Sequence, residues 1–261
     1  MTAEKATAQE ATRKVAFAKV LAIQIIAYVV LVALALVPGM MYGDAAKPAA
    51  VPFTIIASLA MVVLLVVFSP FRDGVAGHVI AAIAGLLSAI CATTVMLGNV
   101  IFPAGLDGGK SFSMEEAWIA GVGGLLIVLI IVSFGRQMAR ENRTHLIRSL
   151  SHSVVEGVAM IASAGWCFLP VLLPTTNSRA AAMSAASGAT VDMFSNVTTT
   201  WVVAAIVTVL VAVALTVCSY FWHRDADPEP DARSPWIGLA LLPVMLTGLA
   251  VGLAALAIVV L

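Results

Sequence analysis

The stretch Trp236–Leu261 reads WIGLALLPVMLTGLAVGLAALAIVVL and contains no Asp, Glu, Lys or Arg in 26 residues. A helix needs about 20 predominantly apolar residues to cross the roughly 30 Å hydrocarbon core of a membrane. The stretch is therefore long enough to span a lipid bilayer, and it predicts a transmembrane helix.

The rest of the chain has the same character. Of its 261 residues, 61% are hydrophobic and 11% are charged, whereas about 25% of the residues in an average soluble domain are charged. So few charges do not cover the surface of a soluble protein of this length, and we expect lipid to be the main solvent. This composition excludes a cytosolic enzyme and a secreted disulfide-linked domain. The net charge of zero also argues against a nucleic-acid-binding protein.

Six further stretches resemble the first in length and composition. The seven expected spans are Val20–Met41, Val51–Ser69, Val79–Phe102, Ala117–Gly135, Val154–Leu173, Thr198–Trp222 and Trp236–Leu261. Their apolar runs are continuous rather than alternating, which indicates helices and not a transmembrane barrel. We therefore expect an all-α, polytopic transmembrane helix bundle of about seven spans. Residues 1–19 would form an N-terminal segment, and residues 20–261 a single transmembrane domain.

The basic residues predict the orientation of this bundle. Seven spans place eleven basic residues on one side: Lys5, Arg13, Lys14, Lys19, Arg72, Arg136, Arg140, Arg143, Arg148, Arg224 and Arg233. The other side receives Lys47, Lys110 and Arg179. Because Lys and Arg accumulate in cytoplasmic loops, the N-terminus is predicted to be cytoplasmic and the C-terminus outside. The expected location is the plasma (inner) membrane.

The tryptophans fall near the predicted ends of the spans. Trp118, Trp166 and Trp201 lie toward the outer ends, and Trp222 and Trp236 flank a cytoplasmic loop. Trp is enriched at membrane–water interfaces, where its ring lies at the level of the headgroups. The pattern therefore predicts an aromatic belt.

A basic hairpin joins the fourth and fifth spans over residues 136–152. Arg136, Arg140, Arg143 and Arg148 recur at near-helical spacing, with apolar residues between them. Such a segment binds anionic headgroups or docks on a partner protein. The alternative is an anchor that only fixes the topology.

Glu156 is the only carboxylate inside a predicted span. An acid within a membrane helix is costly and marks a functional site by default. Three interpretations stay open: a proton or cation site, a structural partner for Arg148 or Arg72, and an interfacial acid near a helix N-terminus.

The four histidines lie near the predicted cytoplasmic boundary, and we expect solvated or headgroup-facing imidazoles. They are His78, His145, His152 and His223. A membrane haem would need imidazoles that face one another across spans, which only His78 and His152 approach. We expect no cofactor and no metal site.

Two patterns of small and polar residues concern the packing of the bundle. Gly248 and Gly252 form a GxxxG motif, which is typical of close helix packing. Polar side chains inside the spans are candidates for the lining of a cavity. They are Gln24, Thr93, Thr94 and Asn99.

No catalytic motif is present: the HExxH, GxSxG and P-loop patterns do not occur. We therefore expect no enzyme. The sequence favours a small transporter or permease-like subunit, because it has many spans, little mass outside the membrane and one intramembrane acid. The alternative is a non-catalytic partner or scaffold subunit of a larger membrane assembly. The expected partners of the chain are membrane lipids with anionic headgroups, another membrane protein or further copies of the chain.

Overall fold

The computed structural model describes residues 17–36, 47–71, 74–95, 113–139, 146–172, 196–225 and 234–260. Within these ranges all regular structure is helical. The elements are an N-terminal helix Phe17–Leu36, α2 (Lys47–Val67), α3 (Gly74–Thr93), α5 (Met114–Met138), α6 (Leu146–Ser163), η2 (Ala164–Phe168), α7 (Leu169–Leu172), α9 (Asn196–Asp225) and α10 (Pro235–Val260). The expected all-α class is confirmed.

Six helical stretches are long and apolar enough to cross a membrane. They are Phe17–Leu36, Val75–Thr93, Met114–Met138, Ser149–Leu172, Trp201–Trp222 and Pro235–Ile258. The second helix contributes a shorter apolar stretch, Pro52–Val67. The chain is thus a helix bundle with the character of an integral membrane protein.

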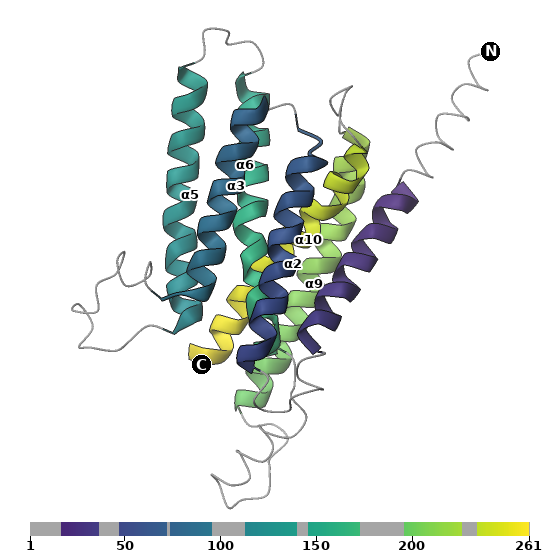
Figure 1. Ribbon diagram of the computed structural model, residues 1–261. Coiled ribbons are helices and arrows are strands. Elements are labelled where there is room, and N and C mark those ends of the chain that lie inside the picture. The colour runs from purple at the N-terminus through teal and green to yellow at the C-terminus, as the bar shows by residue number, and fades with distance from the viewer. Residues whose placement is uncertain are drawn as a thin grey trace, which may run out of the picture.

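Helices that follow one another in the chain run in opposite directions (Figure 1). The N-terminal helix and α10 consequently bring the two termini toward opposite ends of the bundle. We call the end at which α3, α6 and α10 begin the upper end, as it is drawn in Figure 1. Contacts at this end include the ring of Phe17 on that of Tyr220 and the ring of Phe71 on that of His152.

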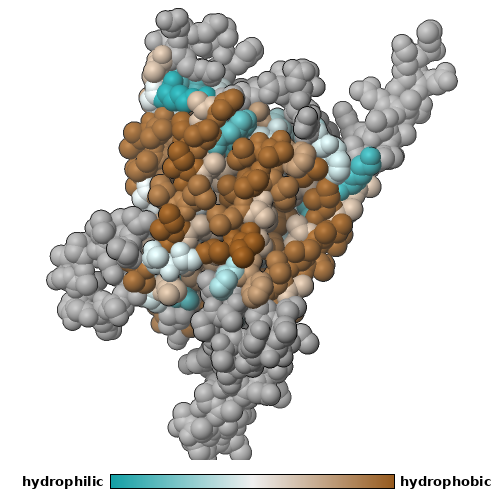
Figure 2. All heavy atoms as spheres, in the orientation of Figure 1, coloured by the Kyte–Doolittle hydropathy of each residue, from teal (hydrophilic) through white to brown (hydrophobic). Residues whose placement is uncertain are grey.

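The continuous rod formed by α6, η2 and α7 lies at the centre of the bundle. It contacts α2, α3, α5 and α10, and all twelve residues from 159 to 170 are buried. By contrast, α9 and the N-terminal helix have many exposed apolar side chains, such as Val209, Leu210 and Ile26. Figure 2 shows apolar residues over the flank of the bundle, where lipid would replace water as the solvent.

The central rod changes from α-helix to a 3-10 turn at η2, and Pro170 supplies a reason. Proline has no backbone N–H and therefore gives no i→i−4 hydrogen bond to the carbonyl of Trp166. That carbonyl instead accepts from the backbone N–H of Leu169, three residues ahead, which is the 3-10 pattern. The rod thus has an irregular turn within its membrane-spanning length.

Two tryptophans expected in an aromatic belt lie in the core instead. Trp118 is 0% exposed and Trp166 is 3% exposed. The indole N–H of Trp118 donates to Ser88 Oγ at 3.1 Å, and that of Trp166 donates to the carbonyl of Val244 at 2.9 Å. The belt prediction is wrong for these two residues, because glycines on α10 and in η2 leave room for the rings inside the bundle.

Candidate functional site: a buried polar cluster between α3, α5 and α6

Glu156 on α6 and His78 on α3 form a hydrogen-bonded pair inside the bundle. His78 Nδ1 lies 2.8 Å from Glu156 Oε1 and 2.9 Å from Oε2, so one ring nitrogen faces both carboxylate oxygens. The Glu156 side chain is 0% exposed and that of His78 is 18% exposed. The carboxylate therefore has no exposed surface of its own, whereas the imidazole beside it is partly exposed.

The sequence of α6 explains why these groups face inward. Its polar residues Ser149, His152, Ser153 and Glu156 recur at intervals of three and four, which places them on one side of a helix. From this side, Glu156 contacts His78 of α3 and Ser149 accepts a hydrogen bond from Gln137 of α5. The polar side of α6 is consequently turned into the protein and away from lipid.

Further polar groups from α5 surround this side of α6. Gln137 is buried, and its Nε2 donates to Ser149 Oγ at 2.7 Å. Ser133 lies about one helical turn before Gln137 and is also buried, and its Oγ has no hydrogen-bond partner among the described residues. We call the whole group the polar cluster, and its members are His78, Ser133, Gln137, Ser149, His152, Ser153 and Glu156.

The polar cluster can hold a proton between two groups of opposite charge. An isolated charge is very costly in a medium of low dielectric constant, but an imidazolium beside a carboxylate is neutral as a pair. A neutral imidazole beside a protonated carboxyl is neutral too. Addition or removal of one proton changes the net charge of the pair by one. Such a pair is chemically suited to binding and releasing a proton within the membrane.

The other polar candidates lie apart from this pair and bind different partners. Gln24 is buried, and its Nε2 donates to Ser219 Oγ on α9 at 3.0 Å. Thr93 and Thr94 each donate to the carbonyl of Ile90 in their own helix. The structure shows no hydrogen bond between Gln24 and either threonine, and Asn99 lies outside the described residues.

Of the four arginines of the basic hairpin, two lie in described helices. Arg136 is in the last turn of α5 and is partly exposed, and Arg148 belongs to the first turn of α6. Arg140 and Arg143 lie outside the described residues.

The glycines of the GxxxG motif contact other helices of the same chain. A Cβ on Gly252 would overlap the Trp118 ring, with Cη2 at 2.7 Å, and one on Gly248 would lie 3.1 Å from the carbonyl carbon of Ala162. Gly165 of η2 lies against the same part of α10, and a Cβ added to it would collide with the carbonyl group of Gly248. The motif thus lets α10 cross the central rod closely.

His78 was expected to be solvated or headgroup-facing, but it lies against the buried Glu156 instead. The sequence contains a signal for this contact, because His78 and Glu156 lie at similar distances from the starts of their predicted spans. His78 immediately precedes one predicted span, and Glu156 is the third residue of another. An acid and an imidazole at the same expected depth, and near the starts of two helices that run in the same direction, are natural partners.

Among the residues that the structure describes, no group of three or more His, Cys, Asp and Glu side chains is arranged to hold a metal ion. In comparisons with known proteins, no family model, no curated protein and no solved structure matches the chain.

Proposed function

We propose that the chain is a small, multi-pass transporter or permease-like subunit of the plasma (inner) membrane, and that the His78–Glu156 pair couples a proton to the movement of its solute. The observation that carries the proposal is the fully buried carboxylate of Glu156, held by an imidazole inside a bundle of apolar helices. Ionisable residues inside membrane helices are rare and typically belong to ion pathways and proton relays.

The irregular turn in the central rod supports the same proposal. Transporters commonly bind their solutes where a membrane-spanning helix is interrupted. Here η2 interrupts the rod that carries Glu156, at a distance of eight residues along the chain. A change of protonation on Glu156 would act on the same rod.

We expect Glu156→Gln to abolish proton coupling, because glutamine keeps the size of the side chain but does not titrate. The purified protein would be reconstituted in liposomes that contain a pH-sensitive dye. Representative amino acids, sugars, organic acids and organic cations would then be added outside. The wild-type protein should acidify the lumen with at least one solute, and Glu156→Gln should reduce that rate at least tenfold.

The matched control for this experiment is Glu115→Gln, the same chemical change at the opposite end of the bundle. It should leave the rate unchanged. A wild-type rate in Glu156→Gln would refute the coupling role, and no proton movement with any of these solutes would refute proton-coupled transport of these four classes.

The second candidate function is a non-catalytic partner in a membrane assembly, and the partly exposed basic residue Arg136 at the end of α5 favours it. The GxxxG motif does not support this partner role, because Gly248 and Gly252 are covered by other helices of the same chain. Purification in a mild detergent separates the two functions. A lone, monodisperse protein with transport activity contradicts the partner role.

We also propose seven crossings, with the N-terminus in the cytoplasm. The alternation of helix directions in Figure 1 supports an odd number of crossings. A cysteine introduced at Gly109 should then react with an impermeant thiol reagent in intact cells, whereas one at Ala226 should react only after the cells are opened. Both cysteines would be introduced into a variant in which the native Cys91, Cys167 and Cys218 are replaced. The reverse labelling would show that the orientation is wrong.

A further inference from the structure

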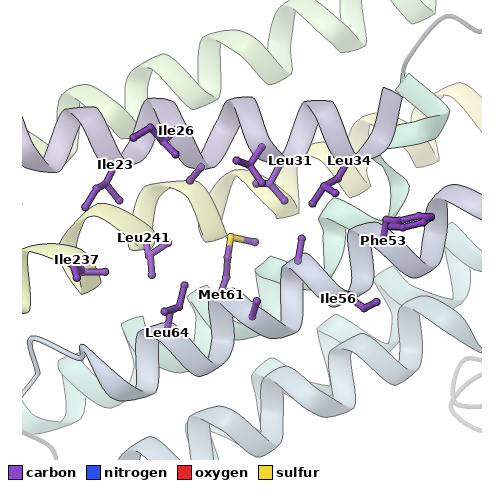
Figure 3. A pocket seen from close by; sticks show the side chains of 14 residues that line it. Ile23, Ile26, Leu31, Leu34, Phe53, Ile56, Met61, Leu64, Ile237 and Leu241 are labelled. Carbon is purple, nitrogen blue, oxygen red and sulfur yellow. The ribbon is translucent and has the colours of Figure 1, made fainter. Parts of the chain in front are cut away.

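An apolar groove of about 470 Å³ lies between the N-terminal helix and α2. Its walls are formed by Ile26 and Val30 on one helix and by Ile56 and Leu64 on the other, and α10 contributes Leu241. Figure 3 shows Ile23 and Ile237 at one end of the groove and Leu34 and Phe53 at the other. All its lining side chains are aliphatic, aromatic or thioether groups, so its occupant within the membrane is a hydrocarbon surface.

The length of the groove matches a hydrocarbon chain of one leaflet. From Ile23 to Leu34 the wall rises by about 16 Å at about 1.5 Å per residue, which is half of the roughly 30 Å hydrocarbon thickness. The groove therefore has the depth of one leaflet, which matches one acyl chain of a lipid.

A cation and an indole ring lie at the upper end of the groove. Lys19 is one helical turn before Ile23, and Trp236 directly precedes Ile237. Lys19 is exposed, and its Nζ lies 5.9 Å from the centroid of the Trp236 ring. Lysine and tryptophan are the residues that typically anchor a protein at the level of lipid headgroups.

We propose that this groove binds one acyl chain of an anionic phospholipid, with the headgroup phosphate at Lys19 and Trp236. The ammonium group attracts the phosphate, and the apolar walls bury the chain of the same lipid. The lipid comes from the leaflet on the Lys19 side. This side is the predicted cytoplasmic one, and the cytoplasmic leaflet carries the anionic lipids.

The test measures the affinity of the first bound lipid by native mass spectrometry of delipidated protein. The two probes are dioleoyl phosphatidylglycerol and dioleoyl phosphatidylcholine, which share their acyl chains and differ in net charge. Wild-type protein should prefer phosphatidylglycerol about fivefold, and Lys19→Gln should remove this preference, because one basic residue near an anionic headgroup has an effect of about that size. Lys19→Arg should retain it.

A second variant tests the groove itself. Ala60 is an exposed lining residue, so Ala60→Trp fills the groove without entering the core, and it should weaken the binding of both lipids at least tenfold. The matched control is Ile131→Trp on the exposed face of α5. It should not change the affinity of the first lipid.

Three outcomes overturn the proposal. Unchanged binding in a folded Ala60→Trp protein places the lipid elsewhere. A preference for phosphatidylglycerol that survives Lys19→Gln removes the headgroup site from Lys19. An Ala60→Trp protein that loses self-association but keeps its lipid shows that a helix of a second copy occupies the groove.

Discussion

Replacing Gly165 with alanine should destabilise the protein by more than about 3 kcal/mol, at or above the upper end of the range for overpacked cores. The added Cβ would collide with the carbonyl oxygen of Gly248 and lie 2.5 Å from its carbonyl carbon. The atoms in the way belong to the backbone of α10, so no side chain can rotate to make room. The rod and α10 would have to separate along their crossing.

The measurement is the thermal unfolding of detergent-purified protein, together with the fraction that is monodisperse after extraction. The same substitution at Gly123 and at Gly135, both on α5, provides the control, because a Cβ there would meet nothing within 4 Å. These two variants should be as stable as the wild type or more stable by up to about 1 kcal/mol, since alanine favours a helix over glycine. If Gly165→Ala unfolds like the controls, α10 does not cross the rod at Gly165.

The helices could be predicted from the sequence because hydropathy is a local property. Each expected span overlaps a helix of the structure, and the Trp236–Leu261 stretch corresponds closely to α10. The close contact of Gly165 with α10 could not be predicted, because it depends on Gly248, which is 83 residues away in the sequence. The GxxxG spacing indicated close packing on α10 but not which element would be packed there.

The burial of Trp118 and Trp166 shows a second limit of local reasoning. Both lie near the expected ends of spans, where a belt is the usual role of tryptophan. Trp118 instead fills the space left by Gly165 and Gly252, two glycines from two other elements. That space exists only after three segments of the chain have assembled. The partner of Glu156 was missed for a similar reason, because the register of α3 against α6 brings His78 to it.

The His78–Glu156 pair should show strong coupling in a double-mutant cycle with leucine. His78→Leu leaves the fully buried Glu156 carboxyl without the imidazole, and loss of one partner of a buried ion pair typically costs about 3–5 kcal/mol. Glu156→Leu should cost less, because the remaining imidazole is partly exposed. The double variant should be close to the wild type in stability, since buried ion pairs are often replaced by apolar residues without loss.

The cycle separates a structural role of the pair from a functional one when transport is measured on the same four proteins. Stability is determined from unfolding in detergent, and proton movement from the liposomes described above. A double variant that is stable but moves no proton shows that the pair is retained for its chemistry, because the fold does not need it. A double variant as unstable as His78→Leu would instead make the pair a structural link between α3 and α6. Effects of the two single variants that simply add would contradict the contact itself.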